Sequence, residues 1–108
     1  MPVADERRSR RVSFDRVNAA ALANIGSLLG AFLPDGRREG GEWSARNPLR
    51  PDRKPGSFKV NLSTGRWSDF ATGDAGGDLV SLVAYLRGLN QRQAAIRLAE
   101  SLGVDPFE

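Results

Sequence analysis

The sequence predicts an α+β fold, in which a small antiparallel sheet of about three strands is flanked by one helix before it and two helices after it. Three observations support this prediction. Near both ends of the chain, apolar residues recur every three or four positions, which is the spacing of a helix with one buried face. Between these regions, short stretches alternate apolar and polar residues, as half-buried strands do. The chain has 108 residues, which is enough for one domain with a modest core.

The N-terminal helix is predicted from a cap residue and an apolar stripe. Ser13 is placed to cap it, and the stripe consists of Phe14, Val17, Ala21, Ile25, Leu28, Leu29 and Phe32. We expect one helix over residues 14–33, ended by Pro34 and Gly36. Residues 1–12 contain four arginines and almost nothing apolar. We therefore expect a basic, disordered arm there, followed by a single domain at residues 13–108.

The middle of the chain predicts the sheet. Residues 42–46 alternate like a short strand, and residues 57–62 and 66–70 alternate on either side of a Ser-Thr-Gly turn, which predicts a β-hairpin. Residues 36–41 and 74–77 are rich in glycine and are expected to form turns. Residues 48–55 contain three prolines, so we expect an irregular loop.

Two further helices are predicted after the sheet. Asp78 is placed to cap the first, whose apolar residues run from Leu79 to Leu86, and Gly88 ends it. Asn90 caps the second, which carries Ala94, Ala95, Ile96, Leu98, Ala99 and Leu102 and stops at Gly103.

Composition excludes several classes of function. The chain has no cysteine and no histidine. It can form no disulfide, a metal could be held by oxygen ligands only, and we expect no cofactor. No stretch is apolar enough to span a bilayer or to act as a secretory signal, so we expect a cytoplasmic protein without a membrane partner. There is no histidine to activate a serine, and no Walker-type loop or Rossmann fingerprint, so we expect no enzymatic activity.

Charge is unevenly distributed along the chain. The net charge is +3, but residues 37–67 carry eight basic and three acidic residues, whereas residues 68–108 carry three basic and six acidic ones. Fourteen of the sixteen basic residues are arginine, which binds phosphate bidentately and stacks on bases. The codon usage of a GC-rich genome accounts for the arginine content equally well. The middle of the chain is the candidate surface for a polyanion.

Candidate nucleic-acid-binding residues fall on the loop and the hairpin, where cations and aromatic rings are interleaved as a single strand requires. They are Arg46, Arg50, Arg53, Lys54, Lys59, Arg66 and Trp67. The alternative is that the basic residues form only a solvated rim. We expect Phe58 and Phe70 in the core, whereas Trp43 and Trp67 fit a core position or a base-stacking one equally well. Gly76 and Gly77 fit a tight turn before a helix cap better than a phosphate cradle.

Two tetrads have the layout of a zinc ribbon without its metal ligands. A ligand-x-x-ligand pair on each side of a hairpin builds a four-coordinate zinc site. Here the four positions hold Asn47, Arg50, Asp69 and Thr72.

The surrounding residues resemble the N-terminal zinc-binding domain of DnaG-type DNA primases and of the primase-helicases of phages and plasmids. That family has Cys-Pro-x-His, a basic Pro-Ser-Phe segment, a hairpin, Cys-Phe-x-Cys and Gly-x-Gly-Gly-Asp. This chain has Asn-Pro-Leu-Arg at residues 47–50, Pro-Gly-Ser-Phe at 55–58, Asp-Phe-Ala-Thr at 69–72 and Gly-Asp-Ala-Gly-Gly-Asp at 73–78. The match covers roughly residues 40–102. The resemblance implies a zinc-ribbon-like sheet.

The departures from the family lie at the ligand positions, so we expect a ribbon that holds no zinc. We expect Arg50 and Asp69 to form a charge-assisted pair there, with Asn47 and Thr72 completing the hydrogen bonds. The alternative is that all four side chains face solvent and that the helices alone stabilise the hairpin.

The resemblance implies a role in replication. It indicates a non-catalytic module that binds single-stranded DNA in a phage or plasmid, beside a separate primase or helicase chain. The alternative is a regulatory module that binds a host or replication protein through an apolar groove between the last two helices and the first.

Overall fold

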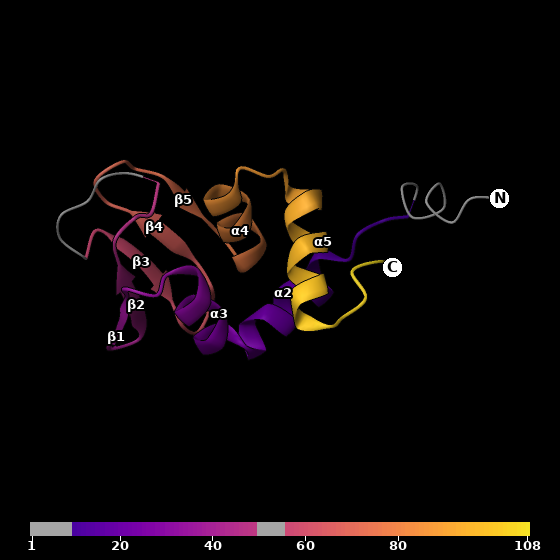
Figure 1. The fold of residues 1–108 in the computed structure, drawn as a ribbon, viewed down its shortest axis with the longest axis horizontal. Coiled ribbons are helices and arrows are strands. Elements are labelled where there is room, and N and C mark those ends of the chain that lie inside the picture. Colours follow the sequence, from indigo (N-terminus) through magenta and orange to yellow (C-terminus); the bar gives the residue numbers. More distant parts are fainter. Residues whose placement is uncertain (1–9, 50–55) are drawn as a thin grey trace.

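The computed structural model describes residues 10–49 and 56–108. In chain order the elements are α2 (Phe14–Ala23), α3 (Ile25–Phe32), β1 (Arg37–Glu39), β2 (Glu42–Ala45), β3 (Phe58–Asn61), β4 (Trp67–Asp69), β5 (Ala75–Gly76), α4 (Leu79–Arg87) and α5 (Gln91–Leu102). Figure 1 shows the sheet at one end of the molecule, α2 and α5 at the other, and α4 between them. The predicted α+β class is confirmed.

The predicted helix ends are confirmed. The side chains of Ser13, Asp78 and Asn90 each accept a hydrogen bond from a backbone N–H in the first turn of α2, α4 and α5. Gly88 and Gly103 follow α4 and α5 in left-handed conformation, with φ of 66° and 70°. A side chain at either position would be strained, so glycine ends both helices cleanly.

The predicted helix over residues 14–33 is not continuous. It divides at Asn24, which lies between α2 and α3 with φ −119° and ψ 24°. The Asn24 side chain donates to the carbonyl oxygen of Ala20 at 2.8 Å, so it competes with the backbone for a helical acceptor. The apolar stripe survives the break, since Val17, Ala21 and Leu29 are all buried.

The sheet has five strands rather than about three. Its order is β1-β2-β3-β4-β5, and every neighbouring pair is antiparallel. The hairpin of β3 and β4 is confirmed. The two glycine-rich segments expected to be turns instead contain the edge strands, since Arg37 pairs with Ser44 and Ala75 pairs with Ser68.

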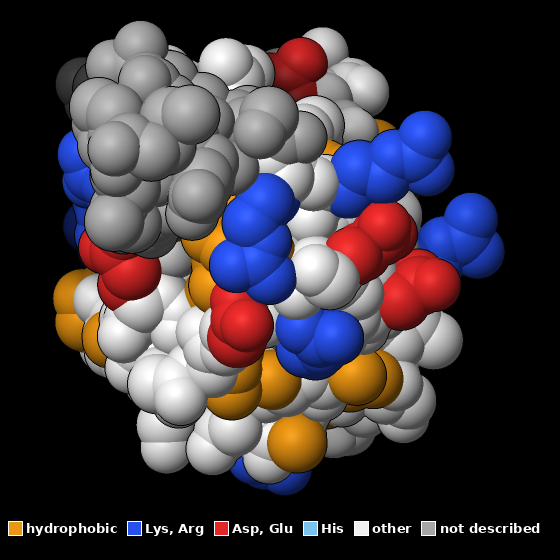
Figure 2. Space-filling model, turned by 90° about the vertical axis from the view of Figure 1, so that its right-hand side faces the viewer, with side chains coloured by type: hydrophobic (Ala, Val, Ile, Leu, Met, Phe, Trp, Pro, Cys, Tyr) orange, Lys and Arg blue, Asp and Glu red, His pale blue; other side chains and the backbone are white. Residues whose placement is uncertain are grey.

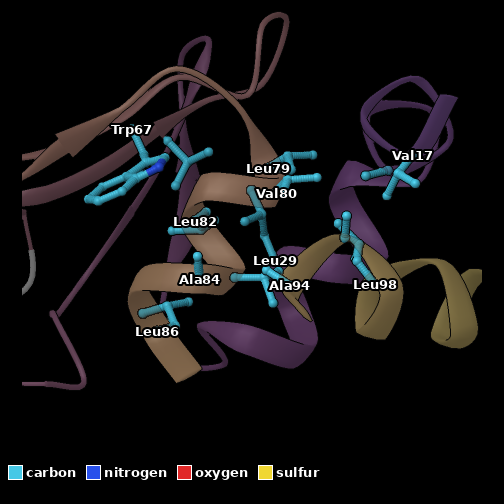
Figure 3. Close-up of a cluster of buried hydrophobic side chains, with 14 of the residues drawn as sticks. Val17, Leu29, Trp67, Leu79, Val80, Leu82, Ala84, Leu86, Ala94 and Leu98 are labelled. Carbon is cyan, nitrogen blue, oxygen red and sulfur yellow. The ribbon is translucent and has the colours of Figure 1, made fainter. Parts of the chain in front are cut away.

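Helix α4 is the centre of the core. Six of its nine residues are buried. The helix packs against α2 and α5, and its Ser81 and Tyr85 contact Trp67 of the sheet. Figure 3 shows Trp67 of the sheet next to α4, and Leu98 of α5 next to Val17 of α2. The inner face of the sheet adds Phe58 and Val60, both fully buried.

Residues 10–12 are attached to the last residues of the chain. Val12 is buried and forms an isolated antiparallel bridge with Phe107. The Arg16 side chain donates to the carbonyl oxygens of Asp105 and Phe107. The predicted disordered arm at residues 1–12 therefore does not include Val12, because this apolar side chain has a distant partner that local sequence cannot show. Residues 1–9 lie outside the described residues.

The described helices include none that is long and apolar enough to cross a membrane.

Candidate nucleic-acid interface

The two faces of the sheet differ in chemistry because side chains alternate along each strand. On β3, Phe58 and Val60 are buried, whereas Lys59 and Asn61 are partly exposed. The register places Lys59 opposite Ser68 of β4. The face away from α4 is therefore polar, and it is hollowed.

This sheet hollow has a volume of about 460 Å³. It is lined by Glu42, Lys59, Asn61, Arg66, Trp67, Ser68, Ala75, Gly76 and Gly77. Lys59 Nζ lies 3.8 Å from the Glu42 carboxylate. Arg66 is exposed, and among the described residues no carboxylate lies within ion-pair distance of it. The hollow thus carries two cations against one anion, which suits a phosphate.

Phe70 is exposed, in contrast to its predicted core position. Its side chain is 75% exposed. Its N–H donates to the carbonyl oxygen of Ser57 at 3.0 Å, so the β3–β4 pairing continues one residue beyond the strand. Because Asp69 points inward, alternation places Phe70 on the same side as Ser68. If Trp67 faces the core, alternation along the strand places Phe70, three residues later, on the opposite face. The sequence could therefore have predicted that Phe70 is exposed.

Trp67 is a core residue, so the interpretation as a base-stacking platform does not fit its position. It is 5% exposed. Its ring centroid lies 5.7 Å from that of Phe58 and 4.7 Å from that of Tyr85. The indole N–H donates to Ser81 Oγ at 3.0 Å. Phe58 is in the core as predicted, and Trp43, which is half-buried, donates to the carbonyl oxygen of Leu33 at 3.2 Å.

The remaining predicted binding residues are not gathered in the hollow. Arg46 is about half exposed and lies 3.8 Å from Asp35, at a separate recess beside the end of α3. Arg50, Arg53 and Lys54 lie outside the described residues, and their role stays a prediction.

The other end of the molecule has mixed charge. Figure 2 views the side that carries α5 and the C-terminal residues, and it shows Lys and Arg side chains interspersed with Asp and Glu. A field of one sign does not form on this side, so it offers a polyanion no uniform attraction.

A polar cluster is centred on two buried tetrad residues, Asn47 and Asp69. Asn47 and Asp69 are each 1% exposed. Asn47 Nδ2 donates to Asp69 Oδ2 and to the Tyr85 hydroxyl, both at 2.8 Å. The Tyr85 hydroxyl in turn donates to Asp74 Oδ2 at 2.7 Å. We call these four residues the polar cluster.

The polar cluster also forms hydrogen bonds within the two turns that follow Asn47 and Asp69. Asn47 Oδ1 accepts the N–H of Leu49 at 2.9 Å, and Asp69 Oδ1 accepts the N–H of Ala71 at 2.8 Å. Thr72 is exposed, and its hydroxyl accepts the N–H of Asp74 at 3.1 Å. Two of the four tetrad positions are thus in direct contact, and Thr72 supports the neighbouring turn. The predicted Arg50–Asp69 pair involves a residue outside the described ones and stays a prediction.

Sequence reasoning missed Tyr85 and Asp74. The available signal was a single phenol on a helix of aliphatic residues, since a half-buried tyrosine hydroxyl normally finds a partner. Burial raises the pKa of the Tyr85 phenol, and the carboxylates of Asp74 and Asp69 raise that pKa further, while the bond from Asn47 lowers it.

Comparison with known proteins finds similarity to a solved structure. No family model matches the chain, and no curated protein matches it. A solved structure of the Aquifex aeolicus primase, comprising its zinc-binding and RNA polymerase domains, is similar with a TM-score of 0.68 and 24% identity. The match covers 84% of this chain and 21% of that chain. The chain has a primase zinc-binding-like fold. It spans about a fifth of the matched primase chain, and the likeness concerns the fold alone.

Zinc does not fit the described residues of this primase zinc-binding-like fold. Asn47 and Asp69 already bond each other and their own turns. Thr72 offers a neutral hydroxyl, which is a poor zinc ligand. In the described ranges, no group of three Asp or Glu side chains is placed to hold a metal. Hydrogen bonds among the polar cluster connect the two turns that a metal connects in a zinc ribbon.

Proposed function

We propose that this chain is a non-catalytic module that binds single-stranded DNA through the sheet hollow. The observation that supports the proposal is the placement of Lys59 and Arg66 in the hollow, with Phe70 exposed directly after β4. Strand alternation continued from Ser68 directs Phe70 to the side of the hollow. Cations bind phosphates and an exposed ring stacks on an unpaired base, so these residues supply both contacts that a single strand needs.

The proposed context is DNA replication in a phage or plasmid. The fold is similar to part of a primase, and a module without catalytic residues of its own would act beside a separate primase or helicase chain. In this proposal Arg50, Arg53 and Lys54, which lie outside the described residues, also contact the phosphates of the strand.

The deciding measurement is fluorescence anisotropy of a labelled oligothymidylate over a salt series. We expect affinity to fall steeply with salt because each phosphate contact releases a counterion. The double variant Lys59→Gln/Arg66→Gln should bind more weakly, with a log–log salt slope about 1.4 units shallower, since two contacts to a single strand are lost.

The matched control is Arg87→Gln/Arg97→Gln, which removes the same charge from α4 and α5. It should bind like the parent chain. Equal weakening by both double variants would mean that only net charge matters. Absence of binding at low salt would reject the proposal altogether.

Phe70→Ala tests the stacking contact separately. We expect affinity to drop by about 1–3 kcal/mol with the salt slope unchanged, because a ring contact releases no counterion. An unchanged affinity would remove Phe70 from the interface.

A further inference from the structure

A further recess lies between α3, α4 and α5. It consists of two adjoining hollows of about 170 and 190 Å³ that share Leu89 and Arg97. We call the two together the helix groove. Its apolar residues include Phe32, Leu89 and Ile96, which are half-buried and pack against the core. The groove shares no residue with the sheet hollow.

The rim of the helix groove is basic. The Arg87 guanidinium lies 5.3 Å from the centroid of the Phe32 ring, which holds this cation at the wall of the groove. Arg97 lines both hollows. In the part of the chain that the structure describes, no carboxylate lies within ion-pair distance of either guanidinium. An incoming carboxylate therefore has two cations available.

The groove carries one anion. Glu100 lines the hollow beside Ile96. It repels a phosphate or a carboxylate at that end, so the positive rim is confined to Arg87 and Arg97. A nucleic-acid backbone carries a charge at every residue and fits this pattern poorly. A peptide whose acidic residues lie on one side of its apolar ones fits it well.

We propose that the helix groove binds a short acidic segment of a partner protein, which places one aliphatic side chain in each hollow and carboxylates against Arg87 and Arg97. Two adjoining hollows suit a segment with two apolar side chains on one face, which a helix presents at residues three or four positions apart. The repulsion by Glu100 sets the direction in which the segment lies. This proposal is independent of the nucleic-acid function.

The test uses a synthetic peptide of about twelve residues with two leucines at helical spacing and glutamates beside them. A second peptide has lysine in place of every glutamate. Backbone NMR shifts of the isotope-labelled full chain are recorded with each. We expect the acidic peptide to shift residues around Phe32, Leu89, Ile96 and Arg97. The lysine peptide should cause no such shifts.

Two double variants separate this site from general attraction of acidic peptides. Arg87→Glu/Arg97→Glu should weaken the acidic peptide about tenfold or more, since two favourable charge contacts become repulsive. The control Arg37→Glu/Arg38→Glu makes the same charge change on β1 and should leave affinity unchanged. Circular dichroism confirms that each variant is folded.

Three results would overturn the proposal. They are absence of binding by the acidic peptide, equal weakening by the two double variants, and shifts confined to the sheet hollow. Shifts of the groove residues by oligothymidylate instead of the peptide would assign the groove to nucleic acid. Failure of DNA binding at the sheet hollow leaves the groove proposal unaffected.

Discussion

At the scale of single residues, Asp69 joins the two turns that the tetrads form. Its carboxylate accepts from Asn47 and from the N–H of Ala71. Asp69→Ala leaves one N–H of the buried Asn47 amide without its acceptor, and an unsatisfied buried donor costs about 1–3 kcal/mol. We therefore expect the free energy of unfolding to fall by about 1–3 kcal/mol, measured by urea denaturation.

Asp35→Ala is the matched control for Asp69→Ala. It removes an exposed carboxylate whose ion pair with Arg46 spans 3.8 Å. Exposed pairs contribute about 0–1 kcal/mol, so stability should change little. Equal stability of the Asp69→Ala variant and the parent chain would show that the polar cluster is dispensable.

Tyr85 provides a second residue-scale prediction, because its pKa is raised in the folded state, first by burial. Below the ordinary tyrosine pKa of about 10, both folded and unfolded chains keep the proton, so Tyr85 contributes no pH dependence. As the pH rises past that value, the unfolded chain loses the proton first. Stability should then fall until the folded pKa is also passed.

Phenolate absorbance near the alkaline transition measures this shift directly, because the chain has a single tyrosine. The native chain should titrate at higher pH than the same chain in denaturant. Coincident midpoints would show that the hydroxyl is not held as a donor to Asp74.

At the scale of elements, Gly76 allows the edge strand β5 to lie against the core. A Cβ added there would come within 2.4 Å of both Trp67 Nε1 and Ser81 Oγ, the two atoms of one hydrogen bond. Gly76→Ala should therefore separate Trp67 from Ser81 and destabilise the chain by about 1–3 kcal/mol.

Gly77→Ala is the adjacent control, since a Cβ at Gly77 meets nothing within 4 Å. Its stability should stay within about 0.5 kcal/mol of the parent chain. Denaturation followed by tryptophan fluorescence measures both variants. Equal stability of the two would contradict the close packing of β5.

The elements also show what sequence can and cannot predict here. Caps such as Asp78 and Asn90 act on N–H groups within the next turn, so local sequence identifies them. Strands of three and two residues are too short to show alternation, and glycines within or beside them resemble turns. The break at Asn24 accompanies a hydrogen bond from its side chain to a backbone carbonyl oxygen. The periodicity of apolar residues does not predict such a bond.

The candidate site was predicted in part for the same reason. Lys59 and Arg66 were chosen as basic residues of the hairpin, and the structure places both at the sheet hollow, while their binding role stays a prediction. Phe70 was placed in the core because it is hydrophobic, and Trp67 was left open between the core and the surface, whereas the structure buries Trp67 and exposes Phe70. Asn47 and Asp69 were found from their spacing. Tyr85 lies on α4, so its role depends on how that helix packs against the tetrads. The spacing of residues along the chain gives no information about this packing.

At the scale of the whole molecule, helix α4 lies between the two surfaces that we propose for binding. It packs against α2 and α5, and its Ser81 and Tyr85 contact Trp67 of the sheet. The sheet hollow lies on the far side of the sheet from α4, and the helix groove lies between α4, α5 and α3. The two surfaces share no lining residue, so this arrangement permits a nucleic acid and a protein segment to bind at the same time.

The packing of the chain ends gives the last prediction. Phe107 is 4% exposed, and the guanidiniums of Arg10 and Arg92 lie 5.1 and 5.7 Å from its ring centroid. It bridges Val12 and so joins the start of α2 to the segment after α5.

Phe107→Ala leaves a cavity and should cost about 3 kcal/mol, which lowers Tm by about 15 °C for a chain of this size. Phe70→Ala deletes the same ring from an exposed position and should leave Tm nearly unchanged. Calorimetry of the two variants compares a buried phenylalanine with an exposed one. The reverse order of Tm would place Phe70 in the core and remove it from the proposed DNA interface.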